Sequence, residues 1–491
     1  MFVPPLKPTF RLLAVFLCVL TCFASKARQQ PVSLADRREL FVDGHLIDSL
    51  NGASLRMHAP VDEGEVLPFD LPWEGAFSAY VTILQDGDTF KAYYRGVPTA
   101  GKDGNSAEVT CYAESTDGIH WQKPHLGIHE VGGDTNNNVI LANEAPITHN
   151  FSPFIDTNPA AKPDERYKAL GGTQKSGLVA FTSPDGIHWK RLQKEPVFRQ
   201  GVFDSQNVSF WSESENRYVC YFRSWTGKGY QGFRSVSRTT SGDFIHWTEP
   251  EPMGFGNTPY EHLYTQQTSP YFRAPHIYLA IGARFMPNRK VVSDEEAKKL
   301  GVNPKYYNDC SDAILMSSRG GTRYYRQFME SFIRPGIGLQ NWVSRSNYPA
   351  LNLVQTGPAE MSLYVNQDYA QPSAHLLRYS MRLDGLASLS AGYAGGEMLT
   401  RPLTFTGNRL ELNFATSAAG EVRIELLDAS GNKLPGYSLE ECRPLIGNEI
   451  SKVVYWNNNA DVSELSGKEI RMRVLLSDAD LFSFRFYASA D

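Results

Sequence analysis

Short apolar runs separated by turn residues recur along the chain, and most are rich in aromatic and β-branched side chains. The runs at 80–84 and 90–94 flank Asp86 and Gly87, a pattern that predicts a β-hairpin. Comparable runs follow at 108–113, 166–170, 217–222, 276–280 and 361–365. A capping box from Ser293 to Glu296 and a stop at Gly301 predict one short helix at 294–300. The pattern therefore predicts an all-β protein.

A seven-residue motif, Ser-x-Asp-Gly-Ile-His-Trp, occurs at 115–121 and 183–189, with a looser copy at 241–247. Weaker echoes occur at 317–320 and 382–385. The copies lie roughly 60–75 residues apart, which suits a four-stranded propeller blade with generous loops. We therefore predict a five-bladed β-propeller over residues 38–392.

The chain changes character near Glu397, where alternating runs such as 409–414 and 421–426 continue without the motif. Several strands in such a length predict a β-sandwich over 396–491. No stretch rich in Gly, Ser or Pro separates the two parts near Gly395. We therefore expect the sandwich to pack against the propeller.

The N-terminus has the layout of a secretory signal peptide: Lys7 and Arg11 precede an apolar run at 12–20, and small residues follow. The prediction is a signal peptide at 1–27, a secreted or periplasmic protein, and no integral membrane segment after its removal. The remaining cysteines, Cys111, Cys220, Cys310 and Cys442, lack metal-ligand spacing. Disulfide pairing and four buried free thiols both remain open.

The composition excludes some classes of function. Lys and Arg number 48 against 53 Asp and Glu, and a net charge of −5 argues against a nucleic-acid binder. Hydrophobic residues at 42% can build large cores, which argues against a disordered chain. No dinucleotide, P-loop, zinc-protease or nucleophile-elbow motif occurs, so no cofactor and no metal site is predicted.

The topology of a blade sorts the polar residues between two faces. The 1–2 and 3–4 hairpins lie on one face, so Asp117, Asp185 and Asp243 of the repeated turns are predicted to be structural. The same reasoning assigns a structural role to Asp86 and Asp156, which fall at 1–2 hairpins.

The stretches that lead into the innermost strands, and the ends of the second strands, are expected to line a central pocket on the other face. Three carboxylates there, Glu74, Asp204 and Glu261, are the predicted catalytic residues. Glycoside hydrolysis needs one carboxyl group to protonate the leaving oxygen and another to attack or to activate water. Arginines there would serve ion pairing or bind an anionic group of the substrate. The predicted substrate-binding residues are Trp73, Arg95, His149, Asn150, Gln206, Arg223, His262, Tyr264 and Arg284.

The five-blade layout with a C-terminal sandwich, together with segments 357–364 and 478–484, resembles secreted bacterial proteins similar to glycoside hydrolase family 32, which is related to the family 43 propellers. The resemblance implies Glu74 as nucleophile or base and Asp204 as acid, with Glu261 as a supporting carboxylate. The Asn-Asp-Pro-Asn-Gly, Arg-Asp-Pro and Glu-Cys motifs of that family are absent, and His149 and Asn150 stand in place of the second. Fructoside specificity is therefore not predicted.

The leading hypothesis is a secreted glycoside hydrolase for a polysaccharide or oligosaccharide. One alternative is a non-catalytic carbohydrate-binding propeller. Another is a sialidase-like enzyme for an anionic sugar, because the repeated turn is similar to the sialidase Asp-box but lacks one residue between Asp and Gly. Carboxylates about 5–5.5 Å apart indicate retaining chemistry, about 6.5–9.5 Å inverting chemistry, and much larger gaps favour binding alone.

Overall fold

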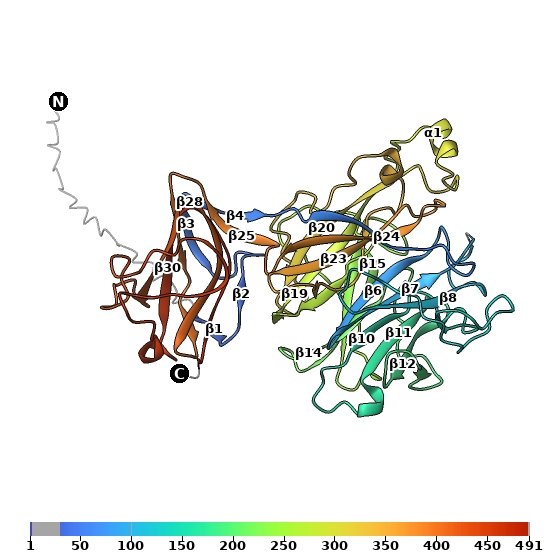
Figure 1. Ribbon diagram of the computed structural model, residues 1–491, viewed down its shortest axis with the longest axis horizontal. Coiled ribbons are helices and arrows are strands. Elements are labelled where there is room, and N and C mark those ends of the chain that lie inside the picture. Colours follow the sequence, from blue (N-terminus) through green and yellow to red (C-terminus); the bar gives the residue numbers. More distant parts are fainter. Residues whose placement is uncertain (2–29, 100, 490–491) are drawn as a thin grey trace.

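The computed structural model of the protein describes residues 1, 30–99 and 101–489, so the predicted signal peptide at 1–27 lies outside the described residues apart from Met1. Figure 1 shows two lobes built almost entirely of strands, with the C-terminus in the smaller lobe. Helices in the described part are α1 (Asp294–Lys299) and the 3-10 turns η1 (Pro163–Glu165), η2 (Leu339–Trp342) and η3 (Ser463–Leu465). The all-β fold class is confirmed.

The larger lobe is a five-bladed propeller, as predicted, and each blade is an antiparallel sheet. The first three blades are β6 (Ala79–Asp86), β7 (Thr89–Gly96), β8 (Val109–Ser115) and β9 (Val139–Leu141); β10 (Ser152–Ile155), β11 (Tyr167–Thr173), β12 (Gly177–Ser183) and β13 (Lys190–Arg191); and β14 (Val208–Ser212), β15 (Arg217–Trp225), β16 (Arg234–Ser241) and β17 (Glu251–Pro252). The fourth blade is β18 (Thr268–Tyr271), β19 (Ala274–Met286) and β20 (Cys310–Ser318).

The fifth blade closes the ring with a strand from near the N-terminus. It consists of β21 (Tyr348–Pro349), β22 (Val354–Gln355), β23 (Glu360–Gln367) and β24 (His375–Arg382), followed by β5 (Val61–Pro68). β5 pairs antiparallel with β24, with Leu376 opposite Leu67. Pairing segments from the two ends of the propeller removes an exposed sheet edge and ties the ring shut.

The smaller lobe contains strands from both ends of the chain. Its sheet holds β1 (Val32–Ala35), β2 (Glu39–Leu40), β3 (Ile47–Asn51), β4 (Ala53–Met57), β25 (Ala387–Ala391), β26 (Gly396–Thr400), β27 (Leu403–Phe405), β28 (Arg409–Asp428), β29 (Asn448–Val453) and β30 (Ile470–Tyr487). The expected boundaries of 38–392 and 396–491 therefore need correction, because 39–57 and 387–391 pair within the sandwich lobe. A short strand carries no mark of its partner in its own sequence, so its lobe could not be assigned from the sequence.

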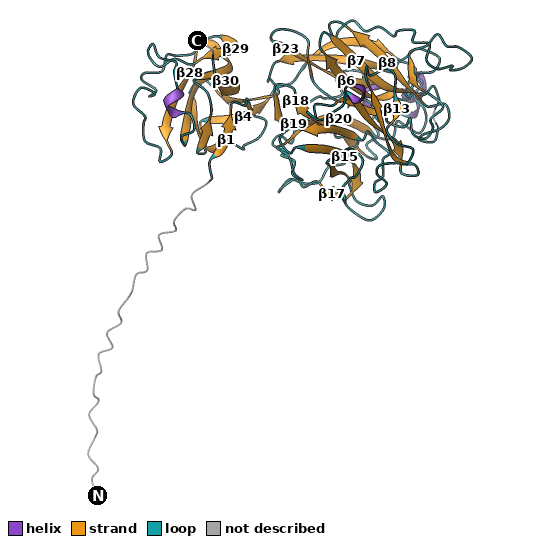
Figure 2. Ribbon diagram, turned by 90° about the horizontal axis from the view of Figure 1, so that it is seen from below, coloured by secondary structure: helices purple, strands orange, loops and turns teal. Residues whose placement is uncertain are grey.

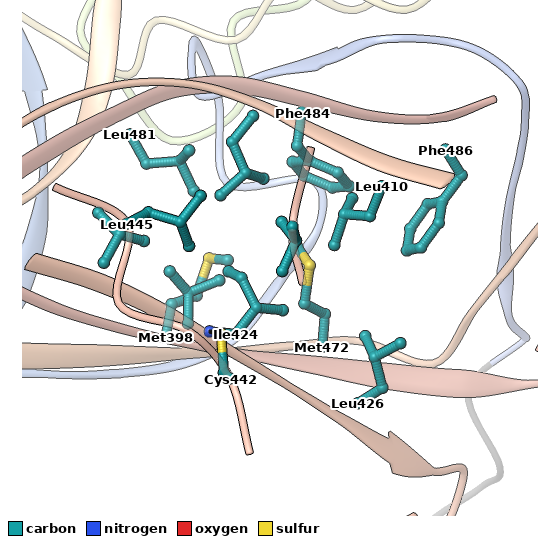
Figure 3. Packing of buried hydrophobic residues seen from close by; sticks show 14 of the residues in the cluster. Met398, Leu410, Ile424, Leu426, Cys442, Leu445, Met472, Leu481, Phe484 and Phe486 are labelled. Carbon is teal, nitrogen blue, oxygen red and sulfur yellow. Dashed lines mark hydrogen bonds between the residues drawn. The ribbon is translucent and has the colours of Figure 1, made fainter. Parts of the chain in front are cut away.

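The core of the smaller lobe follows from alternation along its two long strands. Leu410 and Ile424 on β28 and Met472 and Phe484 on β30 have no exposed surface, and Figure 3 shows them pointing toward one another. Burying each such side chain stabilises the fold by about 1.5–3 kcal/mol.

Buried ion pairs join the two lobes at the junction that Figures 1 and 2 show beside β4. Asp384, directly after β24, accepts hydrogen bonds from Tyr271 Oη (2.8 Å), Arg273 Nη1 (2.9 Å) and Ser483 Oγ of the smaller lobe (2.5 Å). Arg38 Nη1 lies 3.5 Å from the same carboxylate. The sandwich thus packs against the propeller through shared polar contacts, as expected.

The repeated motif forms the same turn three times. Asp117 Oδ1 accepts from the backbone amides of Ile119 and His120, both at 2.8 Å, and Oδ2 lies 2.7 Å from His120 Nδ1. Burial raises the pKa of Asp117, but these hydrogen bonds outweigh it and hold the pKa well below its usual range. Asp185 and Asp243 make the same contacts in the next two blades. The geometry agrees with a structural role for these turns.

Carboxylates at the 1–2 hairpins connect neighbouring blades. Asp156, after β10, accepts from Tyr218 Oη of the third blade (2.7 Å) and from Lys168 Nζ (2.6 Å). Asp86 and Tyr167 form the same link between the first two blades, and Glu215 and Tyr278 form it between the third and fourth, at 3.1 Å. On the face that carries the 1–2 and 3–4 hairpins, called the hairpin face below, a carboxylate of one blade thus accepts a hydrogen bond from a tyrosine of the next and joins the two blades.

The four cysteines of the described residues are free and buried, which settles the open alternative in favour of thiols. No helix in the described ranges is long and apolar enough to cross a bilayer.

Candidate functional site

A buried amide network lies where the innermost strands of the five blades meet. Gln206 Nε2 donates to Thr82 Oγ1 (2.7 Å) and to Ser152 Oγ (3.3 Å). Gln267 Nε2 donates to Gln206 Oε1 (2.7 Å) and to the carbonyl of Pro349 (3.0 Å). The five residues come from, or lead into, the innermost strands of all five blades. Gln206, predicted to bind substrate, is instead buried and held within this structural network.

Three guanidinium groups gather around the ring of Tyr264, which leads into β18. The Cζ atoms of Arg223, Arg345 and Arg234 lie 4.2, 5.1 and 5.6 Å from the ring centroid. Arg223 also donates through Nη2 to the Tyr264 carbonyl. A cation over an aromatic face is stabilised by the ring quadrupole, by about 0.5–2 kcal/mol. The predicted pair Arg223 and Tyr264 thus lies together, and Arg234 and Arg345 join it.

Arg95, near the end of β7, extends this group of arginines to the first blade. Its Cζ lies 4.8 Å from the centroid of Tyr80, and Nη2 donates to the carbonyl of Phe77 (2.9 Å) and to Tyr369 Oη (3.1 Å). Arg345 Nη1 donates to the same Tyr369 oxygen at 3.4 Å. Tyr369 therefore links Arg95 of the first blade to Arg345, which precedes the fifth. We call Arg95, Arg223, Arg234 and Arg345, with the rings of Tyr80, Tyr264 and Tyr369, the arginine–tyrosine cluster.

Positive charge exceeds negative charge in this cluster. Asp204 Oδ1 lies 3.0 Å from Arg223 Nη1 and forms one ion pair. In the described ranges, no carboxylate lies within 4.0 Å of Arg95, Arg234 or Arg345. Burial and the neighbouring charge of Arg223 lower the pKa of Arg234. The cluster is therefore short of anionic partners.

A cavity of about 460 Å³ opens beside Asp204, whose side chain is 30% exposed. Its charged and aromatic lining residues are Lys102, Asp103, His149, Lys175, Phe203, Asp204 and Tyr230. Burial lowers the pKa of Arg95, but Tyr369, Glu108, Tyr80 and, least of the four, Asp103 on the exposed loop after β7 together outweigh it and raise the pKa above its ordinary value. Asp204 and Asp103 are thus the carboxylates that line the space next to the cluster.

His149 lies at the wall of this cavity and is fixed by a buried carboxylate. Its Nδ1 lies 2.8 Å from Glu108 Oε1, and its Nε2 lies 2.9 Å from the amide nitrogen of Asn150. Burial raises the pKa of Glu108, but the hydrogen bond and charge of His149, the charge of Arg95 and the Gly104 amide together outweigh it, and the pKa lies below its ordinary value. Glu108 was not predicted as a site residue, because the sequence pattern placed it inside a strand. Its position at the start of the third strand of the first blade, on the same face as the central pocket, could have identified it as a candidate.

Glu74 is sealed inside the first blade and does not face the central site. It has no exposed surface, and its carboxylate accepts from Tyr94 Oη (2.5 Å), Lys123 Nζ (2.7 Å) and the backbone of Leu71 (3.1 Å). Trp73 turns the same way and donates through Nε1 to the side chain of Asn138 (2.8 Å). The predicted catalytic role of Glu74 is therefore corrected to a structural one, because substrate cannot reach it.

Glu261 lies in a separate environment in the fourth blade. It pairs with Arg284 Nη1 (2.8 Å) and Arg326 Nε (2.9 Å), and Arg284 also binds Asp312 at 2.6 Å. Burial raises the pKa of Glu261, but these two arginines outweigh it and lower the pKa. Glu261, His262 and Arg284 line a second cavity of about 750 Å³. Glu261 is thus saturated with cationic partners and contributes no free carboxylate to the central site.

The sequence and the structure were compared with those of known proteins. No family model and no curated protein matches this sequence. The structure is similar to a protein described as a glycoside hydrolase, with 10% identity and a TM-score of 0.45, over 66% of this chain and 92% of that one. It is also similar to the Bombyx mori family 32 β-fructofuranosidase, with 11% identity and a TM-score of 0.41, over 86% and 94%.

A third similar structure is an N-acetylgalactosamine deacetylase from F. plautii, in complex with blood group B trisaccharide, with 13% identity and a TM-score of 0.41, over 68% and 96% of the two chains. Glycoside hydrolases thus appear repeatedly among the neighbours of this propeller. At these identities and TM-scores, membership of family 32 stays a prediction, and function must be inferred from the residues of this chain.

Proposed function

We propose that the protein is a glycoside hydrolase whose reaction takes place beside the arginine–tyrosine cluster, with Asp204 and Asp103 as its two carboxylates. The observation that carries the proposal is the position of Asp204, which is partly exposed, touches the cluster through Arg223 and shares a cavity with Asp103. Glu74 and Glu261 lack this combination of access and position. The predicted signal peptide further favours an extracellular or periplasmic glycan as substrate.

The surroundings of the two carboxylates divide their roles. The Arg223 guanidinium, 3.0 Å from Asp204, holds and orients that carboxylate, as a nucleophile or general base requires. Asp103 lies on an exposed loop at the cavity mouth, where it can protonate the leaving oxygen of a bound glycoside. This division reverses the acid role that the family resemblance implies for Asp204, because the arginines of this chain surround that residue.

The test is release of reducing sugar from a broad panel of polysaccharides, including uronate-rich and sulfated ones. With a substrate in hand, Asp204→Asn should lower turnover at least about a hundredfold with unchanged folding, and Asp103→Asn at least about tenfold. Asp164→Asn is the matched control, since Asp164 is an exposed carboxylate on the hairpin face, paired with Lys190. Near-normal turnover in Asp204→Asn would show that the carboxylate assignment is wrong.

A second candidate function is carbohydrate binding without hydrolysis. The ion pair between Asp204 and Arg223 favours it, because a carboxylate held by an arginine can position that arginine for a ligand without taking part in a reaction. One experiment distinguishes the two functions: a protein that only binds carbohydrate binds polysaccharides of the panel but releases no reducing sugar from them.

A further inference from the structure

We propose that the arginine–tyrosine cluster binds an anionic substituent of the glycan, a carboxylate or a sulfate ester, through guanidinium groups that have no carboxylate partner. This inference rests on the proposed function for the carbohydrate nature of the ligand, and it adds the chemical class of the sugar.

The first support is how the protein treats its other buried arginines. Six arginines are buried in the described part of the chain, and five have a carboxylate within 4.0 Å: Arg38, Arg223, Arg238, Arg326 and Arg378. Arg95 is the sixth, is 7% exposed, and has none. A buried charge without a counter-charge is costly, so the protein pairs arginines wherever it buries them for structure. Arg95 departs from that rule at the central face.

The second support is unused hydrogen-bonding capacity. Among the described residues, five arginine Nε atoms are buried without a hydrogen-bond partner, and three of the five, those of Arg95, Arg223 and Arg234, lie together in this cluster; the other two belong to Arg238 and Arg401. Buried polar atoms are normally satisfied, and several orphaned donors in one place point to a ligand that supplies acceptors. A guanidinium presents its donors as a planar fork that matches the oxygens of a carboxylate or sulfate.

The third support is the arrangement of the cluster. Arg95 comes from the first blade, Arg223 and Arg234 come from the third, and Arg345 precedes the fifth. Shared contacts with Tyr264 and Tyr369 hold these side chains together. The tyrosine rings are buried and hold the guanidinium groups in place, so that these groups can fix a charged substituent of the sugar. The net charge of the whole chain is −5, so this local excess of positive charge is not a general property of the surface.

Matched pairs of polysaccharides test the proposal by equilibrium binding. Polygalacturonate is compared with its carboxyl-reduced form, and a sulfated galactan with its desulfated form, using the Asp103→Asn variant in the cold, which slows turnover and keeps the ion pair between Asp204 and Arg223 in place. We expect at least one anionic member to bind about tenfold or more tightly than its neutral partner, and the two pairs distinguish carboxylate from sulfate.

Substitutions assign that preference to the cluster. Arg345→Gln and Arg234→Gln should each lower affinity for the preferred anionic glycan at least about fivefold, and Arg345→Lys should lose less. Arg334→Gln is the control: Arg334 is exposed and lines the second cavity. It should leave affinity unchanged. Folding of each variant is checked by its thermal melting curve.

The outcomes separate this inference from the proposed function. Equal binding of both members of every pair, or no binding of any anionic member, overturns anion recognition, whatever the enzyme hydrolyses. Selective binding that Arg345→Gln and Arg234→Gln leave intact also overturns it. Selective binding that is lost in these variants supports it, even where the wild-type protein releases no reducing sugar and the hydrolase assignment falls.

Discussion

The two faces of the propeller treat charge in opposite ways. On the hairpin face, Asp86, Asp156 and Glu215 each accept from a tyrosine of the next blade and also pair with an arginine or lysine. On the central face, Arg95 and Arg345 rest on tyrosine rings and have no carboxylate partner among the described residues. Carboxylates paired with cations join the blades, whereas arginines without a carboxylate partner can still pair with an anionic group of a ligand.

This difference shows that a conspicuous motif need not be a functional one. The repeated Asp-Gly turns were the strongest signal in the sequence, and they use their carboxylates on their own backbone. The central arginines lie outside that motif, and Arg95 and Arg223 share only their place near the end of a second strand.

The largest effect is expected from breaking a matched pair on the hairpin face. Asp156→Ala removes the acceptor of Tyr218 and leaves the buried ammonium group of Lys168, with 5% exposure, only the more distant carboxylate of Glu165 at 3.7 Å. Losing one partner of a buried pair costs about 3–5 kcal/mol, so the free energy of unfolding in urea should fall by about that amount. The specific activity of the folded fraction should not change.

A second substitution identifies the cause of that loss. Lys168→Met in the Asp156→Ala background removes the stranded charge and should recover part of the lost stability. If the double variant is no more stable than Asp156→Ala, the buried charge is not the source of the effect.

The next effect is a dependence of stability on pH at the link between the first two blades. The hydrogen bond from the Arg166 guanidinium, opposed by burial, lowers the pKa of Asp86 from 3.8 to about 2. A lowered pKa in the folded state means that the stabilisation is present above about pH 3.8 and is lost as the pH falls toward 2. Because the pair is partly exposed, we expect on the order of 1 kcal/mol. Asp86→Asn should remove this contribution, and urea unfolding at pH 5 and at pH 2.5 should show a smaller difference than in the wild-type protein.

A smaller effect is expected at the repeated turn of the second blade. Asp185→Ala removes acceptors for the amides of Ile187 and His188, both within 2.9 Å, and should cost about 1 kcal/mol with little direct effect on turnover. Asp185→Asn keeps one acceptor oxygen and should cost less. A severe loss of activity in Asp185→Ala at unchanged melting temperature would place function on the hairpin face and invert the comparison.

Local signals predicted the blades, whereas contacts between distant segments decided the site. Alternating runs and repeated turns were enough to predict five blades, because four blades consist of consecutive strands and the fifth takes only β5 from elsewhere in the chain. The partners of Glu74 and Glu261, Lys123 and Arg326, lie 49 and 65 residues away in the sequence. No sequence spacing marks those pairings. Glu74 and Glu261 therefore seemed available for catalysis until the fold showed their neutralising partners. Asp204 and Arg223, both expected on the central face from strand topology, form an ion pair at 3.0 Å.

The smallest expected effect on stability is on the central face, at Arg234. Its guanidinium stacks 4.8 Å from the ring centroids of Trp225 and Phe285, but burial and the charge of Arg223 lower its pKa, which marks an unfavourable place for a cation. In Arg234→Gln, the lost stacking and the relieved repulsion oppose each other, so the free energy of unfolding should change by no more than about 0.5 kcal/mol. Arg238→Gln is the matched control, because Arg238 lies on the same strand and pairs with Glu215, and its removal should destabilise the protein by more than 1 kcal/mol, as expected for loss of a buried charged hydrogen bond. A loss in Arg234→Gln as large as that in Arg238→Gln would show that the central arginines hold the fold together, and the distinction between the two faces would fail.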